Sequence, residues 1–549
     1  MLFPTFDFLL FVIPVLIGAW LLADKPIARV VFLLVASYFF YMAGPKTEPP
    51  PAPWYFAGLL LFSTLLDYLC GWAIFNDDEA ADSDDEAKAE AAKRRRRRWL
   101  TLSLVGNLGV LGYFKYANFF LEAIHDVLSV AGMNVPTYRL DVILPLGISF
   151  YTFQSLSYTL DVYRGRMEPE RNFVRFALFV VFFPQLVAGP IVRANQFLPQ
   201  LREGPRFSYE RFQDGGFRIL KGLFKKVVLG DYIAVHFTDK IFDAPETFTA
   251  PELAIALYAY TLQIYADFSG YTDIAIGVGK MLGYELPENF NRPYQARDMA
   301  EYWRRWHMTL AGWLRDYLFF PVMARLGSRG GYFALWLTMF LVGMWHGASW
   351  NFVIYANLHA AAVVFNRWNR TRDREERTAI QTWVYWPFGV LVGFAAAAGL
   401  FHGVLMLSWT VAAVLAGVSA AVFLFVCWLP DSDSWINGAV HTALMFHFVV
   451  LSRIFFRAPD LDTARRFVDS LTDVSVLAVR PGLVSPLVGA LLVGGLAVHF
   501  TPKAWVDEHL RKWFGAMPGV LQGAAYLVLL LLLAWLMDGA PRAFIYFQF

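Results

Sequence analysis

The chain has 549 residues, of which 57% are hydrophobic and only 17% are charged. Soluble domains carry about 25% charged residues, so this composition excludes an ordinary soluble protein and indicates a polytopic membrane protein. The formal net charge of +2, with no basic strip interleaved with aromatic residues, predicts that nucleic acid is not a partner. Cys70 and Cys427 stand alone in apolar segments, at no spacing typical of a metal site or a disulfide, so we expect no metal centre.

Apolar runs recur along the whole chain. A helix needs about 20 apolar residues to cross a hydrocarbon core about 30 Å thick, and several of these runs approach that length. We therefore expect one all-α integral membrane domain over residues 1–549, with about 11 to 14 membrane segments, some of them short, tilted or re-entrant. The runs are Phe8–Ala23, Val30–Met42, Trp54–Phe75, Trp99–Phe120, Phe173–Phe183, Leu253–Ile264, Leu335–Met344, Phe352–Phe365, Val384–Leu400, Val404–Leu429, Ala439–Phe456, Leu483–Phe500 and Val520–Met537.

Basic residues set the orientation of the N-terminal helices, which occupy residues 1–139. Residues 76–98 form a charged loop that ends in five consecutive arginines, so the positive-inside rule places it in the cytoplasm. Its acidic part, Asp77–Glu86, has the composition of a disordered segment. By alternation Lys25 and Arg29 lie inside, and the N-terminus, which has no nearby Lys or Arg and no cleavable signal, lies outside.

Residues 366–549 form a C-terminal set of helices whose topology the rule leaves open. The segment Asn366–Arg377 carries five arginines and is expected in the cytoplasm. If Val384–Leu400 and Val404–Leu429 both crossed the membrane, the arginines between Arg453 and Arg466 would lie outside. We therefore expect one of these two segments not to cross fully.

Residues 140–365 have a different character from the flanking parts. Polar and charged residues stand inside or beside apolar runs that Gly and Pro join, and lipid does not satisfy the backbone groups that such breaks expose. This pattern indicates irregular backbone lining a cavity, and we take it as the catalytic core. Its segments are Leu144–Gly165, Phe182–Arg193, Gly222–Asp231, Tyr265–Tyr294, Glu301–Pro321 and Leu341–Phe352.

One core segment predicts an interfacial or re-entrant helix over Glu301–Phe320. Its charged residues lie off the aromatic stripe, and Arg305 and Arg315 are suited to anchoring the helix at lipid headgroups. His307 lies beside the stripe. The stripe comprises Trp303, Trp306, Leu310, Trp313, Leu314 and Tyr317.

His346 and His307 are the two histidines in dense Trp, Gly and Arg surroundings. An ionisable group inside a membrane is costly, which makes each a functional hypothesis. If residues 349–365 form a helix toward the cytoplasmic arginines, they rise about 25 Å and place His346 deep in the membrane. A neutral imidazole there fits a general base that removes a hydroxyl proton. The alternative is a histidine that hydrogen-bonds between helices.

The core motifs together resemble the membrane-bound O-acyltransferases, in the bacterial branch that includes the alginate O-acetylation and teichoic-acid D-alanylation membrane proteins. The resemblance covers residues from about 140 to 365, with further matches near residue 453 and at the C-terminus, and the alginate-type subgroup is the more similar. The segments that carry it are Leu144–Gly165, Phe182–Arg193, Asn289–Pro321, Leu341–Phe352, Arg453–Ala458 and Phe544–Phe549.

The resemblance implies a ring of helices around a thinned centre, with a funnel and a tunnel, in a bacterial inner membrane with the N-terminus periplasmic. It implies that His346 is the catalytic residue and His307 a second important one. The implied acyl donor is acetyl-CoA or a derived acetyl carrier, with no bound cofactor. The implied acceptor is an exopolysaccharide such as alginate, reached through a periplasmic acetyltransferase partner in a polysaccharide biosynthesis complex, with membrane lipid around the chain.

Several other residues are candidates for supporting roles. Arg304 or Arg305 is suited to binding donor phosphates, with headgroup anchoring as the alternative. Three acids near the core motifs have two alternative roles. One of them could fix the tautomer of a histidine, or they could form ion pairs and helix caps. The candidate substrate-binding residues are Trp303, Arg304, Arg305, Trp345, Asn351 and Asp316. The three acids are Asp267, Asp273 and Asp316, and the turn-forming candidates are Asn289 and Asn291.

Three other classes of function remain open at the level of sequence. A secondary transporter or flippase predicts inverted repeats with paired broken helices, and none is visible. A lipid-linked glycosyltransferase predicts acidic residues that hold a metal on an aqueous loop, but the one dense acidic run lies in the low-complexity loop. A non-catalytic or transport component of an exopolysaccharide export complex is the main alternative to the acyltransferase.

Overall fold

The computed structural model describes residues 3, 5–43, 55–81, 84–133, 135–327, 330–371 and 435–536. Every regular element within these ranges is a helix, which confirms the all-α prediction. Two expected runs, Val384–Leu400 and Val404–Leu429, lie outside the described residues, as does Phe544–Phe549.

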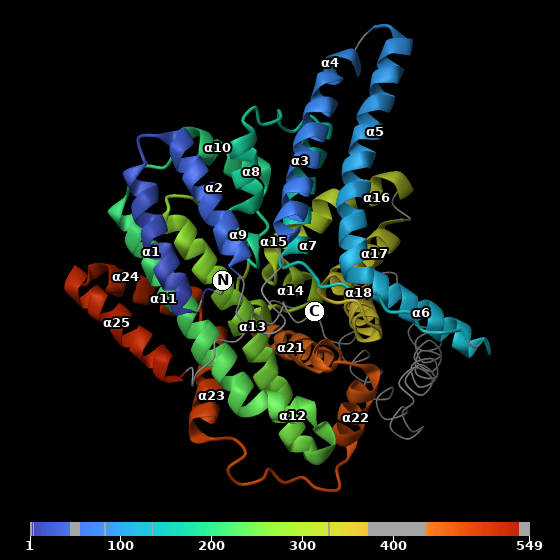
Figure 1. The fold of residues 1–549 in the computed structure, drawn as a ribbon. Helices are drawn as coiled ribbons and strands as arrows, with labels where there is room; N and C mark the ends of the chain where they lie inside the picture. The colour runs from blue at the N-terminus through green and yellow to red at the C-terminus, as the bar shows by residue number, and fades with distance from the viewer. Residues whose placement is uncertain are drawn as a thin grey trace.

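The helices follow one another in three groups, drawn in Figure 1 from blue to red. The first group is α1 (Phe6–Leu21), α2 (Pro26–Met42), α3 (Tyr55–Asn76), α4 (Asp78–Ala81), α5 (Glu86–Leu111), η1 (Gly112–Tyr116) and α6 (Ala117–Val130). The core group begins with α7 (Ile148–Tyr163), α8 (Phe173–Val181), α9 (Phe183–Leu186), α10 (Ala194–Glu203), α11 (Tyr209–Leu223), η2 (Phe224–Asp231), η3 (Ala234–Thr238), α12 (Asp239–Asp243), η4 (Pro245–Thr247) and α13 (Ala250–Met281). It continues with η5 (Pro293–Gln295), α14 (Met299–Arg305), α15 (Met308–Leu314), η6 (Arg315–Phe319), α16 (Phe320–Leu326), α17 (Gly331–His346) and α18 (Trp350–Thr371). The last group is α21 (Trp435–Arg457), α22 (Leu461–Thr472), α23 (Pro486–Phe500), η9 (Ala504–Glu508), α24 (His509–Ala516) and α25 (Gly519–Leu536).

Few of the described helices are both long and apolar enough to cross a bilayer alone. By length and composition α3 and α21 meet that standard, and α23 together with η9 and α24 forms a third candidate, bent by 102°. The shorter apolar helices include α1 and α2. The expected number of crossings therefore stays a prediction.

The segment of residues 76–98 was expected to be a loop, and this expectation is wrong. Helix α5 begins at Glu86 and includes all five arginines, and α4 lies just before it, at the outer end of the α3 and α5 pair (Figure 1). Asp85 caps the helix by accepting hydrogen bonds from the backbone N–H groups of Ala87 and Lys88. The run is rich in Ala, Lys, Glu and Arg, which are strong helix formers. Their helix propensity therefore favours a helix here, although the run is highly charged.

The segment Glu301–Phe320 is not one continuous helix, which corrects a second expectation. Helix α14 ends at Arg305 and α15 begins at Met308, because His307 adopts a left-handed backbone conformation with φ 44°. The break is held by the irregular segment that precedes η5, because the Met308 N–H donates a hydrogen bond to the Asn289 carbonyl at 2.9 Å. The aromatic stripe is therefore divided between two short helices.

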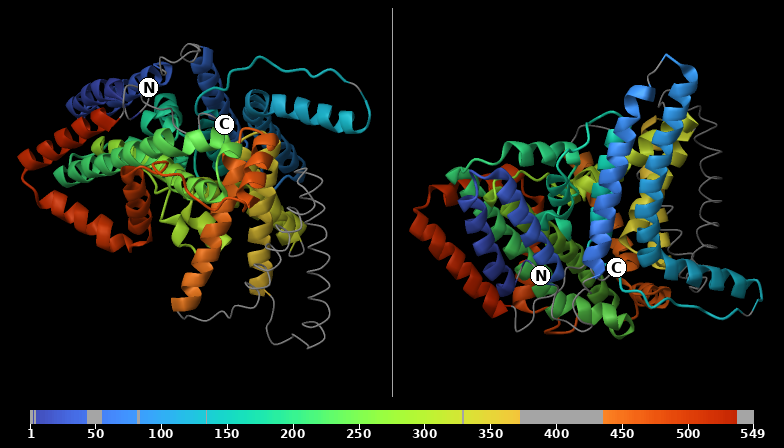
Figure 2. Two further views of the ribbon diagram at one scale, coloured as in Figure 1. Left: turned by 90° about the horizontal axis from the view of Figure 1, so that it is seen from below. Right: turned by 45° about the horizontal axis from the view of Figure 1, so that its top comes forward.

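Helix α13 is the central support of the core. It has 32 residues, most of them buried. Helix α11, which has 15 residues, lies along part of it (Figures 1 and 2). The two helices touch backbone to backbone at glycines: a Cβ on Gly270 would lie 2.7 Å from the Gly222 carbonyl oxygen, and one on Gly277 would lie 2.6 Å from that of Gly215. Small residues permit this close approach between membrane helices, which no larger side chain allows.

We expect Gly270→Val to destabilise the protein by about 1–3 kcal/mol, because the added methyl groups force α11 away from α13. Thermal unfolding of the detergent-purified protein measures this as a lower midpoint. Gly109→Val is the matched control, since nothing lies within 4 Å of a Cβ at Gly109. Equal midpoints for the two variants would contradict the close contact.

Candidate functional site

His346 stands at the turn between α17 and α18. It is the last residue of α17 and only 1% exposed. A Cβ on Gly343 would overlap Ala356 of α18, and a Cβ on Gly347 would overlap the Phe352 ring, so only glycine allows the two helices to close this tightly. The expected helix over residues 349–365 is present as α18.

Aromatic rings surround the His346 imidazole. Ring centroids lie 5.1 Å away for Trp345, 5.2 Å for Phe456, 6.1 Å for Tyr355 and 6.4 Å for Trp303. These rings come from α17, α21, α18 and α14, so residues distant in the sequence build one wall. The predicted tryptophans Trp303 and Trp345 both belong to it.

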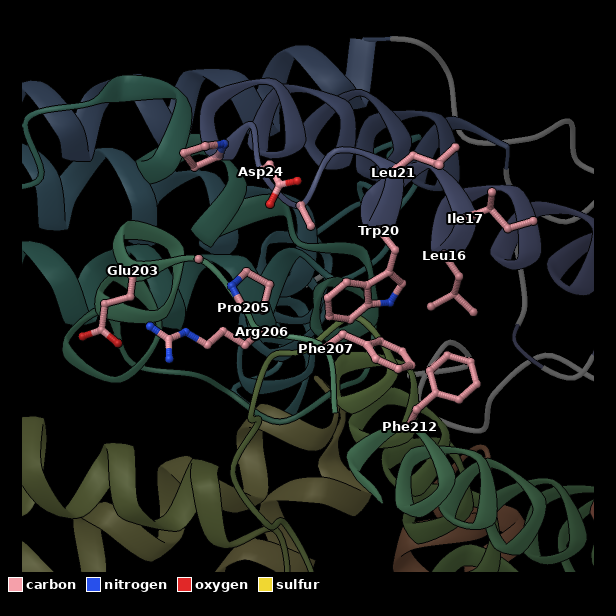
Figure 3. A pocket seen from close by; sticks show the side chains of 13 residues that line it. Leu16, Ile17, Trp20, Leu21, Asp24, Glu203, Pro205, Arg206, Phe207 and Phe212 are labelled. Carbon is pink, nitrogen blue, oxygen red and sulfur yellow. The ribbon is translucent and has the colours of Figure 1, made fainter. Parts of the chain in front are cut away.

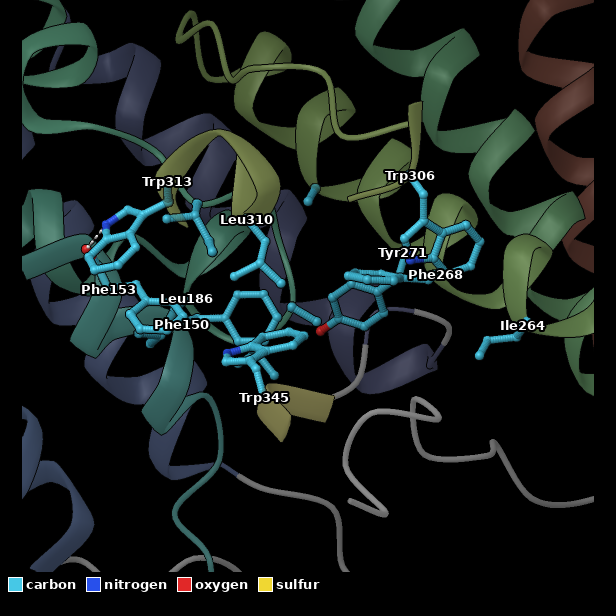
Figure 4. Close-up of a cluster of buried hydrophobic side chains, with 14 of the residues drawn as sticks. Phe150, Phe153, Leu186, Ile264, Phe268, Tyr271, Trp306, Leu310, Trp313 and Trp345 are labelled. Carbon is cyan, nitrogen blue, oxygen red and sulfur yellow. Dashed lines mark hydrogen bonds between the residues drawn. The ribbon is translucent and has the colours of Figure 1, made fainter. Parts of the chain in front are cut away.

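The second histidine meets the same indole. His307 is fully buried, and its ring lies 5.1 Å from Trp345 and 4.9 Å from Phe268. Trp345 is thus equally close to both imidazoles, and Figure 4 shows it beside Phe150 in the buried cluster. The two histidines predicted from the sequence are therefore brought to one place.

Asn289 determines which ring nitrogen of His307 carries the hydrogen. The Asn289 Oδ1 lies 3.0 Å from His307 Nδ1 and accepts hydrogen bonds from the Thr309 backbone N–H and hydroxyl. Because the Thr309 N–H can only donate, the Asn289 atom is the oxygen, and His307 Nδ1 must carry a hydrogen. In the neutral ring this leaves Nε2 as an acceptor, and within the described residues it has no hydrogen-bond partner. Sequence reasoning assigned Asn289 to a turn and missed this contact.

A fully buried arginine lies behind the aromatic wall. Arg453 of α21 donates to the Tyr302 hydroxyl at 3.0 Å, and its guanidinium stands over the rings of Trp306, at 5.1 Å, and Phe456, at 5.3 Å. Phe456 in turn contacts His346. From the sequence, Arg453 is recognised only as part of the segment Arg453–Ala458. Its contact with Tyr302 is not predicted, because no local pattern indicates which helix the side chain faces.

A small cavity of about 50 Å³ reaches His346. It is lined by the turn before α7 and the start of that helix, residues 144–150, and by Val187, Trp345 and Lys115. Gly147 opens α7 at φ 71°, and a Cβ there would lie 2.6 Å from the Leu186 carbonyl oxygen, so the turn requires glycine. Lys115, from η1, is not among the residues predicted from the sequence.

A larger cavity of about 840 Å³ approaches His307 from another side. Phe290 lines it and lies 4.9 Å from Phe268, whose ring lies 4.9 Å from His307. Two aromatic rings therefore connect this cavity with the histidine pair. Its basic lining residues are Arg218, Lys221, Lys225, Lys280, Arg292, Lys503 and Arg511.

A third cavity, of about 870 Å³, lies away from the histidines, between the end of α1 and the turn before α11 (Figure 3). Trp20, Phe207 and Phe212 form its apolar side, and Glu203 and Arg206 its polar side. None of the predicted site residues lines it. Its size does not make it the site, because it has no reactive group comparable to the two imidazoles.

The three candidate acids all form ion pairs. Asp273 contacts Arg218 at 2.9 Å and Lys225 at 2.8 Å, and Asp316 contacts Arg193 at 2.5 Å. Asp267 pairs with Lys226. These contacts favour the ion-pair alternative over a carboxylate that orients a histidine.

The other predicted binding residues lie at the margin of the site. Arg305 pairs with Glu301 at 2.7 Å, Arg304 is exposed, and neither lines the two cavities near the histidines. Asn351 is buried at the start of α18, where its Nδ2 donates to the Ala458 carbonyl at 2.8 Å. Their substrate-binding role stays a prediction.

We expect nitrogen NMR of histidine-labelled protein to show neutral His307 with a protonated Nδ1 and a bare Nε2. Asn289→Leu removes the acceptor, so the ring should then populate both tautomers. The His307→Gln variant identifies the signal. A wild-type ring protonated at Nε2 would contradict the assignment.

Comparison with known proteins places the chain in a family. Residues 169–407, which include both histidines, match the family described as "MBOAT, membrane-bound O-acyltransferase family". The chain is 37% identical over 401 residues to the "Probable alginate O-acetylase" of Azotobacter vinelandii, covering 72% of this chain and 74% of the relative. It is 33% identical over 398 residues to the "Peptidoglycan O-acetyltransferase" of Helicobacter pylori, covering 67% and 70%. It is 31% identical over 272 residues to the "Teichoic acid D-alanyltransferase" of Bacillus subtilis, covering 46% and 66%.

Proposed function

The chain belongs to the membrane-bound O-acyltransferase family and is an O-acyltransferase, and on this premise we propose that it transfers an acetyl group from a cytoplasmic thioester toward an acceptor hydroxyl across the inner membrane. His346 is the general base of this reaction. The observation that carries the proposal is the burial of His346 and His307 against one indole, with a separate cavity approaching each.

The positions of the two cavities support transfer between opposite sides. Helix α5 carries the arginine run near its middle and ends at Leu111, 13 residues or about 20 Å beyond Arg98, and Lys115 follows in η1. The small cavity therefore lies at the end remote from the arginines. The larger cavity includes Lys280. The carbonyl of the next residue, Met281, accepts a hydrogen bond from Trp20 at 3.0 Å, and Trp20 lies near the loop that contains Lys25. The positive-inside rule puts that loop in the cytoplasm.

The reaction needs few groups because a thioester is already activated. The acceptor oxygen attacks the acyl carbon as His346 takes its proton, the C–S bond then breaks, and the departing thiolate is protonated. The protein must hold the two reactants in line and keep water away, and the aromatic wall around His346 suits both tasks. The bare Nε2 of His307 is available to accept a hydrogen bond from the acceptor or a bound water.

The donor is acetyl-CoA or a derived acetyl carrier. Both present phosphates, which guanidinium and ammonium groups recognise. The larger cavity offers seven such groups against five acids, Asp214, Asp273, Glu288, Asp507 and Glu508. This balance supports phosphate binding there. On α14, Arg304 is exposed and Arg305 is half-buried beside Glu301, and neither lines this cavity.

The acceptor chemistry rests on the relatives. Their names attach acyl transfer to alginate, peptidoglycan and teichoic acid, so we propose an exopolysaccharide such as alginate as the final acceptor. A periplasmic acetyltransferase partner would carry the group from the small cavity to the polymer, within a polysaccharide biosynthesis complex. The N-terminus would then be periplasmic.

We expect His346→Ala to lower transfer of label from radiolabelled acetyl-CoA about 10²- to 10⁴-fold, the range of general-base catalysis. The assay uses purified protein with its periplasmic partner and polymer. The control is His447→Ala, since His447 is exposed on α21.

Normal transfer by His346→Ala would show that the base is assigned wrongly. Solute flux in proteoliposomes without any thioester would instead support the transport alternative. Thermal midpoints of both variants near that of the wild type are needed for either conclusion.

A further inference from the structure

A lysine shares the small cavity with His346. Lys115 belongs to η1, the wider helical turn that follows α5. Its Nζ donates to the Trp345 carbonyl at 2.5 Å and lies 5.5 Å from the centre of the Trp345 ring. Among the described residues no carboxylate lies within 4.0 Å of this ammonium. The cavity next to the general base therefore contains a lysine side chain that pairs with no carboxylate among the described residues.

The local backbone brings this lysine to the end of α17. Single π-helical turns inside α-helices are frequent at functional sites. Here the turn aims two neighbours at the last carbonyls of α17: Lys115 contacts that of Trp345, and the Tyr116 hydroxyl donates to that of Met344 at 3.1 Å. Both satisfy groups that a helix end leaves open.

Capping α17 does not by itself require a charge. Tyr116 satisfies the adjacent carbonyl with a neutral hydroxyl, so a neutral donor is sufficient at this helix end. An ammonium has three N–H donors, and the single contact with Trp345 uses one of them. Burying an ammonium group in a membrane protein is costly, and a negative charge that forms beside it during a reaction offsets that cost.

We propose that Lys115 stabilises the oxyanion that forms when the acceptor attacks the thioester carbonyl beside His346, an inference that rests on the proposed function. In that step the acceptor O–C bond forms, its proton moves to His346, and the carbonyl π electrons move to oxygen. When the oxyanion collapses, the C–S bond breaks and the thiolate takes the proton from His346. Lys115 keeps its own protons throughout and supplies a fixed positive charge.

The cavity has room for this intermediate. Its volume of about 50 Å³ exceeds the roughly 10–15 Å³ of cavity that one water requires. A two-carbon acyl group therefore fits between Lys115 and His346, whereas the adenine nucleotide of a donor does not. The bulk of the donor must stay in another part of the protein.

The test separates stabilisation of charge from anchoring of the helix. Lys115→Met keeps the length of the side chain and removes its charge, so we expect acetyl transfer from acetyl-CoA to fall about 10²- to 10³-fold, as for the loss of one oxyanion donor. The fall should lie in kcat with little change in KM, because the charge acts on the transition state. Lys115→Arg should restore at least a tenth of the wild-type rate, roughly as expected for a retained charge.

Two further variants serve as controls. Tyr116→Phe removes the neighbouring contact with α17 and no charge, and transfer should stay within about threefold of the wild type. Lys88→Met removes a positive charge from the exposed face of the same α5 and should change nothing.

Three outcomes would overturn the inference: wild-type transfer by Lys115→Met, an equal loss in Tyr116→Phe, or no recovery in Lys115→Arg with a lowered thermal midpoint. If His346→Ala is inactive while Lys115→Met is normal, the inference fails and the proposed function stands. If His346→Ala is fully active, the proposed function fails first.

Discussion

The site depends on the position of one indole. Trp345 lies 5.1 Å from both His307 and His346, and its backbone carbonyl receives the ammonium of Lys115. Moving this residue would separate the histidines from each other and from the cation. Its place is set by the end of α17, which glycine contacts press against α18 and which two side chains of η1 cap. Packing and chemistry therefore share the same few atoms, and a change in one alters the other.

The surrounding helices keep water from these atoms. The wall around His346 takes rings from α14, α17, α18 and α21, and α13 with α11 supports it through direct contact at glycines. A thioester reacts with water as readily as with an unactivated alcohol unless the site excludes water. The aromatic wall thus serves the proposed reaction by separating the imidazoles from bulk water. The two cavities described above approach the histidines through it. The buried Arg453 adds a fixed charge behind this wall, in contact with Tyr302.

The sequence predicts the all-helical fold, the core region and both histidines, because these depend on composition and on local motifs. It fails where the outcome depends on distant partners. The expected single helix over Glu301–Phe320 is divided at His307 by contacts with Asn289, 18 residues earlier in the chain. The arginine run is a different kind of failure, because its helix follows from local signals: the Asp85 cap and the helix propensity of the run itself. Lys115 lies inside the expected apolar run Trp99–Phe120, where a charged residue is a general signal of function but does not indicate which groups it meets. Only the contact with Trp345, 230 residues away, gives it a role.

The central claim is that acyl donor and acceptor meet at His346. The most direct measurement is a cryo-electron microscopy structure of the protein with a non-hydrolysable acetyl-CoA analogue, a thioether in which a methylene group separates the carbonyl carbon from the sulfur. The account predicts its carbonyl group in the small cavity, with the carbonyl oxygen within about 3.2 Å of the Lys115 ammonium and His346 next to the acyl carbon. A thioether bound with its acyl end elsewhere, for example in the cavity beside Trp20, would contradict the account.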